Sequence, residues 1–236
     1  MWLNNLRREP GAIDMSLAGK SVLFVYYTYS QQTRLVVEVM ADALRERGCE
    51  VRLARLEFTD PQYAGRFSSF PLRHAYRDIF GMVLPQLRGV TGQIVIPDEA
   101  RDSHYDLVCI ASPTWWLHPC MPIRSFLESD LAGTLLSGKP FAAVAVAHRY
   151  WRDDLKILKQ LGVKRGGQYV DGSHFTAGGG PVDSMLALFS FLSTGVTKDR
   201  YLGIKIPPAT LPPSYVGQAQ AFANGLVDRI AEASIV

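Results

Sequence analysis

Residues 21–48 read SVLFVYYTYSQQTRLVVEVMADALRERG, and this stretch changes character twice along its length. It begins with a nearly continuous apolar run at residues 22–27, which is typical of a buried parallel strand. Apolar side chains from Leu35 to Leu44 then recur at the spacing of one helix face, and Gly48 supplies a stop signal. The stretch therefore predicts a strand, a short polar turn and a helix.

Three further apolar runs predict strands at residues 51–56, 107–112 and 141–147. The last two are nearly continuous, whereas VRLARL at 51–56 alternates and fits an edge strand. Helical patterns lie at 122–129, at 153–161 before an apparent stop at Gly162, and at 215–233. This alternation of strands and helices predicts a three-layer α/β fold with right-handed crossovers.

Two segments are longer than ordinary connections, namely residues 60–104 and 176–213. We interpret 60–104 as an insertion in a single domain that spans residues 19–236. Its aromatic residues could build a lid, a dimer contact or a small satellite core, and these alternatives stay open. Residues 1–18 precede the first strand and are interpreted as an N-terminal extension.

Composition limits the classes of function. The chain has 236 residues, of which 47% are hydrophobic and 20% charged, as in globular domains. A net charge of +3 without a dense basic run argues against nucleic-acid binding, and no apolar run is long enough to span a membrane. The three cysteines, Cys49, Cys109 and Cys120, are far apart and suggest a reducing compartment, so we expect a cytoplasmic location.

The turn after the first strand carries TYSQQT at residues 28–33. A strand that turns tightly into a helix presents free backbone N–H groups and the positive end of the helix dipole. Hydroxyl groups at Thr28, Ser30 and Thr33 add donors, so the turn suits a phosphate without a lysine. The alternative is an ordinary hydroxyl cap of the helix.

This turn resembles the flavodoxin phosphate loop, whose pattern is Ser/Thr-any-Ser/Thr-Gly-any-Thr. Gln31 departs from the pattern because the family has glycine there, and a side chain restricts the backbone φ angle. The resemblance implies a flavodoxin-like three-layer sandwich with a five-stranded parallel sheet in the order 2-1-3-4-5. It also implies FMN as cofactor, with its phosphate held by Thr28, Tyr29, Ser30, Gln31, Gln32 and Thr33.

Two later turns should meet this one, because ligands of such sheets bind at the carboxyl ends of the strands. The segment SPTWWLHP at 112–119 resembles the family segment beside the flavin ring. In related flavoproteins the turn at 148–151, HRYW here, contacts the pyrimidine edge of the flavin. The ring contacts that the resemblance implies are Pro113, Thr114, Trp115, Trp116, His148, Arg149, Tyr150 and Trp151.

His148 is the candidate catalytic residue, since a cation or donor there would stabilise negative charge on reduced flavin. Either His148 or Arg149 could take this role, while Arg149 could also be a solvated charge. Each tryptophan could instead pack in the core. His118, His148 and His174 could in principle hold zinc, but their spacing does not support a metal site, and we expect none.

A closer resemblance extends over residues 21 to about 195, to flavodoxin-like proteins labelled dialkylresorcinol condensing enzymes. It rests on YDLVCIASPTWWLHPCMPIRSFLES at 105–129, AVAHRYW at 145–151 and FLSTG at 191–195. No Cys-His-His condensing pattern accompanies it. The resemblance implies an FMN-dependent oxidoreductase for a quinone-like, cyclic or polyketide-derived small molecule in secondary metabolism.

For such an oxidoreductase, NAD(P)H could be the electron partner, or the substrate itself could donate the hydride. The resemblance to flavodoxin-like oxidoreductases, among which dimers are common, implies a homodimer. Two other functions stay open. One is a flavodoxin-type electron carrier, although such carriers are typically acidic and this chain is not. The other is a flavodoxin-like binding scaffold that has lost FMN, for which Gln31 is the main argument.

Overall fold

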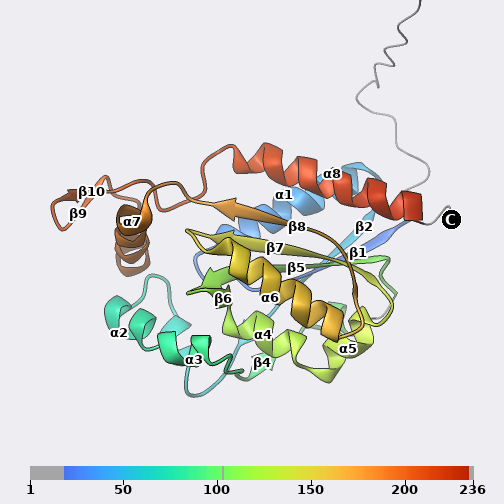
Figure 1. The fold of residues 1–236 in the computed structure, drawn as a ribbon, viewed down its shortest axis with the longest axis horizontal. Coiled ribbons are helices and arrows are strands. Elements are labelled where there is room, and N and C mark those ends of the chain that lie inside the picture. The colour runs from blue at the N-terminus through green and yellow to red at the C-terminus, as the bar shows by residue number, and fades with distance from the viewer. Residues whose placement is uncertain (1–18, 103, 234–236) are drawn as a thin grey trace, which may run out of the picture.

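A central parallel sheet organises the computed structural model, which describes residues 19–102 and 104–233. The extension expected at residues 1–18 lies outside the described residues. The sheet runs in the order β2-β1-β5-β7-β8, which is the expected order 2-1-3-4-5 (Figure 1). Its strands are β1 (Ser21–Tyr26), β2 (Glu50–Arg55), β5 (Leu107–Trp115), β7 (Pro140–Ala147) and β8 (Gln168–Thr176).

The three inner strands β1, β5 and β7 are the continuous apolar runs, and their side chains are almost wholly buried. Strand β2 lies at one edge, as its alternating sequence predicts. The other edge is β8, whose sequence QYVDGSHFT gave no strand signal because most of its residues are only half-buried. Five short strands add to the expected five: β6 (His118–Pro119) pairs with β5, β3 (Glu57–Phe58) with β4 (Ile94–Val95), and β9 (Arg200–Tyr201) with β10 (Ile204–Lys205).

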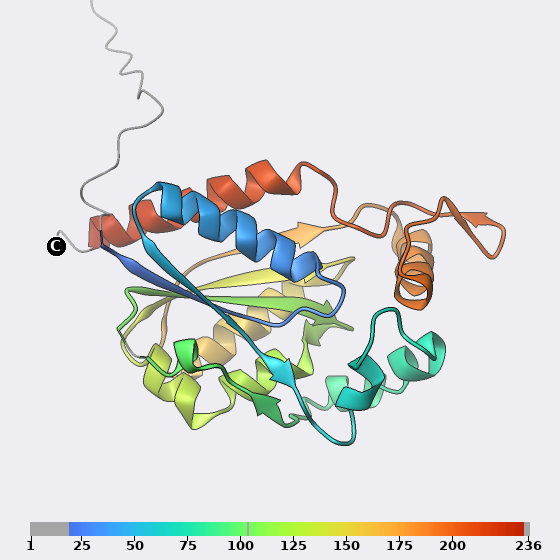
Figure 2. The ribbon, with the colours of Figure 1, turned by 180° about the vertical axis from the view of Figure 1, so that it is seen from behind.

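Helices cover both faces of the sheet (Figures 1 and 2). One face carries α1 (Gln32–Glu46) and α8 (Tyr215–Ala233), which pack on each other and on residues such as Phe24 and Val144. The opposite face carries α4 (Met121–Leu127), α5 (Asp130–Leu136) and α6 (Trp151–Lys164). Its core includes Ile110, Phe126 and Leu158. Two hydrophobic layers therefore hold the sheet from both sides.

The stop expected at Gly162 is wrong, because α6 continues to Lys164. A Cβ atom on Gly162 would lie 2.4 Å from the Cζ atom of Phe141 on β7. The glycine therefore allows the helix to approach the sheet closely and does not end the helix. The sequence patterns also did not predict helix α5 or helix α7 (Pro181–Thr194).

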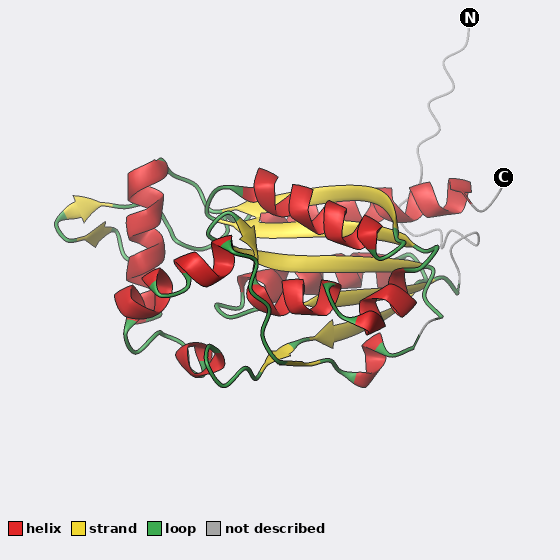
Figure 3. Ribbon diagram, turned by 60° about the horizontal axis from the view of Figure 1, so that its bottom comes forward, coloured by secondary structure: helices red, strands yellow, loops and turns green. Residues whose placement is uncertain are grey.

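The first part of segment 60–104, with α2 and α3, and the segment 176–213 lie at the carboxyl end of the sheet, where α7 stands across the ends of the strands (Figure 3). The last part of segment 60–104 returns to the amino end of the sheet, where β5 begins (Figure 2). The segment 60–104 contains η1 (Ala64–Phe67), α2 (Ala75–Phe80), α3 (Val83–Leu87) and η2 (Asp98–Ala100). Tyr63 and Met82 pack with Met121 in a small satellite core, one of the alternatives for this segment. Among the helices of the described ranges, none has the length and apolarity needed to cross a membrane.

Candidate functional site at the carboxyl end of the sheet

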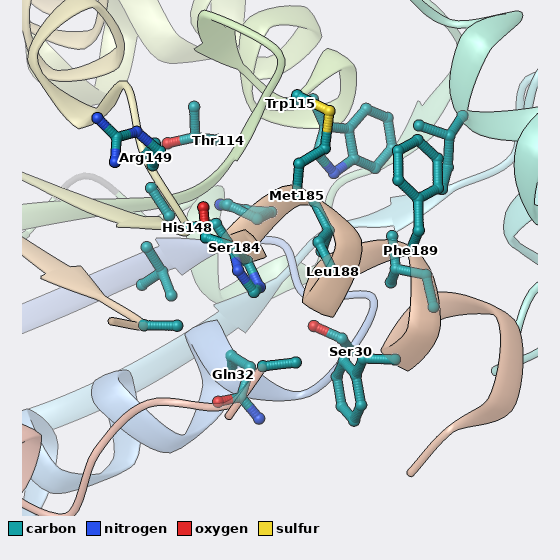
Figure 4. A pocket seen from close by; sticks show the side chains of 18 of the residues that line it. Ser30, Gln32, Thr114, Trp115, His148, Arg149, Ser184, Met185, Leu188 and Phe189 are labelled. Atoms are coloured by element: carbon teal, nitrogen blue, oxygen red, sulfur yellow. The ribbon is translucent and has the colours of Figure 1, made fainter. Parts of the chain in front are cut away.

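A cavity lies where the turns after β1, β5 and β7 meet. Parallel strands place their carboxyl ends at one edge, and the order of this sheet reverses between β1 and β5, so a ligand crevice is expected there. Side chains from all three turns and from α7 gather around the cavity (Figure 4). Helix α2 and the proline-rich link before α8, at residues 206–213, complete its walls with Ile79 and Leu211.

Most of the residues expected to bind a cofactor line this cavity. They are Tyr29, Ser30, Gln32, Pro113, Thr114, Trp115, Trp116, His148, Arg149 and Tyr150. Four of the expected residues, Thr28, Gln31, Thr33 and Trp151, are not part of its lining. The three turns are therefore brought together, but not every side chain within them faces the same space.

The turn at 28–33 has the backbone shape that a glycine would favour. Gln31 adopts the left-handed conformation, with φ 65° and ψ −8°, so the departure from the flavodoxin pattern keeps the local path of the chain. Gln31 is the N-cap of α1, and no side chain within the described turn caps the helix by a hydrogen bond. The alternative of an ordinary hydroxyl cap is therefore wrong for this helix.

Thr28 adds a second observation at the same turn. Its side chain is only 2% exposed, and its Oγ1 atom has no hydrogen-bond partner in the described part of the chain. Buried hydroxyl groups are normally paired, so this one has a donor to spare beside an uncapped helix terminus. Thr33 is buried as well, in the first turn of α1. The turn fits an anionic group that would complete these hydrogen bonds.

Two side chains fasten this turn to distant segments. The Tyr29 hydroxyl donates to the Ser69 carbonyl oxygen at 2.5 Å, and the Tyr29 ring packs edge-on against Phe67. The Gln32 Oε1 atom accepts a hydrogen bond from the backbone N–H of Leu211 at 2.9 Å. The turn is thus tied to the segment 60–104 on one side and to the proline-rich link on the other.

The aromatic turn after β5 is a tight hairpin between β5 and β6, with Trp116 in the left-handed conformation at φ 57°. Helix α2 holds it, because the Trp116 Nε1 atom donates to the Ile79 carbonyl oxygen at 3.2 Å. The Trp115 ring stacks on Phe67 with centroids 4.5 Å apart. The hairpin therefore presents two indole rings to the cavity in fixed positions.

His148 follows β7 and lies next to Ser184 of α7 (Figure 4). Burial lowers the pKa of His148 to about 4, although hydrogen bonding to the backbones of Ala209 and Ser184 opposes this shift. The imidazole is therefore neutral at pH 7, and its buried Nδ1 atom has no partner among the residues described. The neighbouring positive charge is Arg149, whose guanidinium donates to the Gly179 carbonyl oxygen at 3.4 Å.

Trp151 lies outside the cavity lining and packs as the first residue of α6. Its ring stacks on His174 of β8 with centroids 3.5 Å apart, and the Arg152 Cζ atom lies 4.6 Å from the centroid of the Trp151 ring. The described residues contain no group of three His, Cys, Asp or Glu side chains placed to hold a metal ion. His118 is engaged elsewhere, since its Nδ1 atom is 2.8 Å from the Gln86 carbonyl oxygen.

Helix α7 forms a wall of the cavity that the sequence analysis missed. Its inner face lines the cavity with Met185, Leu188 and Phe189, while Ala187 packs on the other side against Ile206. A helix that is apolar on two faces shows no single stripe at helix period. The available signals were the proline at its first position and Gly195 directly after its last residue, which has φ 75°.

Comparison with known proteins agrees with this architecture. A flavoprotein from Lactobacillus acidophilus NCFM, solved in complex with FMN, matches with a TM-score of 0.50 and 18% identity over 66% of this chain and 93% of that one. A flavodoxin, WrbA-like protein from Agrobacterium tumefaciens matches with a TM-score of 0.50 and 11% identity over 91% and 99%. No protein-family model and no curated protein sequence matches the chain. The chain has a flavodoxin-like fold.

Proposed function

We propose that this protein is an FMN-dependent oxidoreductase that acts on an uncharged, ring-containing small molecule. One observation carries the proposal: a single cavity joins a polar turn with an uncapped helix terminus to a wall of aromatic and aliphatic side chains. FMN has the same division, with a phosphate at one end and a tricyclic ring at the other. The similar flavoprotein from Lactobacillus acidophilus was solved with FMN, which supports the proposal by analogy.

The phosphate would bind at the turn 28–33. The unpaired Thr28 hydroxyl, the Ser30 hydroxyl and the backbone N–H groups at the start of α1 would donate to it. Thr33 would contribute through its backbone N–H, which lies in the first turn of α1. Gln31 would shape the turn through its left-handed backbone conformation.

The ring would lie between the Trp115 hairpin and the turn at His148, against α7. Bound FMN would supply hydride and single-electron chemistry, while the protein positions the reactants and excludes water. We keep His148 as the proposed catalytic residue, now in the neutral form that its lowered pKa requires, able to donate or accept one hydrogen bond. Arg149 would supply the positive charge that favours a reduced ring.

The substrate side of the cavity favours a neutral molecule. The lining contributed by α7 and α2 is apolar, with Met185, Leu188, Phe189 and Ile79. A charged substrate would lose its hydration there without gaining a partner. A quinone-like or polyketide-derived ring, as the resemblance to the dialkylresorcinol group implies, would suit these walls, with NAD(P)H as electron donor.

Location and assembly remain predictions. The three cysteines are free and buried, which supports the proposed cytoplasmic location. Exposed apolar side chains such as Leu84 and Leu202 would suit the contact of a homodimer.

The walls of the cavity argue against the electron-carrier alternative. A carrier passes electrons through an exposed ring edge, whereas apolar side chains of α2 and α7, such as Ile79 and Leu188, line this cavity and would lie against the ring. The scaffold alternative relied on Gln31, and the left-handed conformation of that residue removes its main argument.

The test begins with the purified protein, which we expect to be yellow and to release FMN on heating, as identified by mass. We then expect NADH or NADPH to reduce a neutral quinone much faster than a sulfonated one of similar potential. A protein that neither retains nor rebinds FMN would contradict the proposal. Equal rates with both quinones, together with fast electron transfer to a protein acceptor, would favour the carrier.

A matched pair of variants on α7 locates the substrate. Leu188→Trp fills the apolar side of the cavity, so turnover of the neutral quinone should fall at least tenfold while FMN is retained. Val182→Trp is the control, because Val182 is 70% exposed on the same helix. Equal activity of the two variants would show that the substrate binds elsewhere.

A further inference from the structure

A buried carboxyl group lies directly behind the cavity. Asp154, in the first turn of α6, has no exposed surface, and its Oδ2 atom is hydrogen-bonded to the hydroxyl oxygen of Thr114, which lines the cavity. Its Oδ1 atom is buried without a partner among the described residues. Asp154 also forms no ion pair within the described chain, because the nearby Arg124 pairs with Glu128 instead, so no salt bridge compensates a full negative charge.

The groups around Asp154 leave it neutral at pH 7. Burial raises the pKa of Asp154 to about 8, and the hydrogen bond from Thr114 and the Arg124 guanidinium on α4 only partly oppose this shift. The adjacent Cys120 thiol is itself kept protonated, since burial raises its pKa. On the remaining sides β7 contributes only apolar side chains, while β6 contributes His118.

Other titratable side chains near Asp154 come from the rest of α6 and from the edge strand β8. Asp153 and Lys156 line a shallow surface depression together with His118. His174 of β8 stacks on Trp151 at the start of the helix. None of these groups is hydrogen-bonded to the Asp154 carboxyl, so Thr114 is the direct contact through which Asp154 can act.

We propose that Asp154 is a positioning residue that decides whether the Thr114 hydroxyl offers a hydrogen or a lone pair to the ligand in the cavity. An ionised carboxylate can only accept, so it fixes the Thr114 hydrogen toward itself. A protonated carboxyl can donate to the Thr114 oxygen, which frees the Thr114 hydrogen for the ligand. The Thr114 hydroxyl therefore acts as a donor toward the ligand when Asp154 is protonated and as an acceptor when Asp154 is ionised.

The consequence for FMN rests on the proposed function. A flavin ring presents more acceptor atoms than donors, so a donating Thr114 should bind it better. FMN affinity should then fall about tenfold as the pH rises from 6.5 to 9.5, which corresponds to the loss of one good hydrogen bond.

The experiment measures the dissociation constant of FMN against pH for the full chain and three variants. Asp154→Asn keeps a permanent donor toward Thr114, so its affinity should match the wild type at pH 6.5 and stay constant up to pH 9.5. Thr114→Val removes the hydroxyl and should bind about tenfold more weakly at pH 6.5, without further loss at high pH. Asp153→Asn is the control on the same turn and should keep the wild-type profile.

Carbon-13 NMR of the aspartate carboxyl groups gives a readout that does not depend on activity. The wild type should show one carboxyl that titrates near pH 8, which persists in Thr114→Val and is lost in Asp154→Asn. A profile in which Thr114→Val still loses affinity at high pH would mean that charge acts directly, and would overturn the proposal. If the wild type binds FMN tightly with an affinity that does not change with pH, the proposed role of Asp154 is overturned but the proposed function is not. If the wild type binds no FMN at any pH, the proposed function is overturned as well.

Discussion

The side chain of Gln32 binds the backbone N–H of Leu211 across 179 positions of sequence, with a distance of 2.9 Å between its Oε1 atom and the amide nitrogen. This bond joins the first turn of α1 to the link that precedes α8. The same link reaches the turn after β7, because Ala209 of the link and His148 line the same cavity. The link therefore spans two of the three turns that surround the cavity.

Replacing Gln32 should separate closure of this link from binding of a phosphate. Gln32→Ala removes the acceptor, so the Leu211 amide should exchange its hydrogen at least tenfold faster with deuterium. Gln32→Glu keeps an acceptor but adds a negative charge at the polar turn. We expect it to preserve slow exchange while weakening FMN binding, which equilibrium titration would measure. Fast exchange in both variants would mean that the bond does not hold the link.

The unpaired hydroxyl of Thr28 should act in opposite directions on stability and on binding. Thr28→Val removes a buried polar atom without changing shape, so the ligand-free protein should keep its stability or gain about 1 kcal/mol. FMN affinity should fall roughly tenfold, because the phosphate loses a donor. Urea unfolding and FMN titration measure the two effects.

Thr134→Val is the control for that change. Thr134 is exposed on α5, and its hydroxyl binds only the Asp130 carbonyl oxygen of its own helix. It should leave FMN binding unchanged. Unaltered FMN affinity in Thr28→Val would place the phosphate away from this hydroxyl.

Gly162→Ala should destabilise the protein by about 1–3 kcal/mol, because the new methyl group would overlap the ring of Phe141. Phe141→Leu should recover part of this loss in the double variant, as chemical denaturation would show. Gly225→Ala in α8 meets no atom within 4 Å and should instead be neutral or stabilising by up to about 1 kcal/mol. Equal effects of the two alanines would contradict the close approach of α6 to the sheet.

Asp154 should make stability depend on pH in a defined direction. Its pKa is raised from 3.8 to about 8 in the folded protein, so the folded state binds the proton more tightly than the unfolded chain. Its favourable contribution is complete below about pH 4 and is lost as the pH rises to about 8. As the pH rises across this range, the free energy of unfolding of the wild type should therefore fall relative to that of Asp154→Asn, by at most about 1.4 kcal/mol per pH unit. Unfolding experiments on both proteins would measure this difference. A difference that stays constant from pH 5 to 8.5 would argue against a buried neutral carboxyl.

The parts of this fold that the sequence predicts are those whose burial is complete. Strands β1, β5 and β7 are enclosed on both faces, so their sequences are apolar runs, and the turns that follow them are located with them. Strand β8 has an exposed edge and mixed residues such as Asp171 and Ser173, so it carries no such run. The local hydrophobic pattern of the sequence therefore predicts the inner strands more readily than the edge strand β8.

The cavity walls were harder to predict than the turns. Leu72, Ile79 and Met82 reach the cavity only because segment 60–104 folds back over the sheet, which no local pattern records. Gly162 has the residue type of a helix end, yet its role depends on Phe141, a contact between distant segments. The pairing of Thr114 with Asp154 likewise becomes visible only when the two elements are packed together.

Helix α7 stands beyond the ends of the strands (Figures 1 and 3); a loop joins its start to β8, and the β9–β10 hairpin and the proline-rich link join its end to α8. It is also the element that supplies Met185, Leu188 and Phe189 to the cavity. Homologous proteins could therefore acquire a wider, narrower or more polar binding chamber by exchanging this one helix, while the parallel sheet and the turn at 28–33 stay as they are. Substrate range would then evolve independently of cofactor binding.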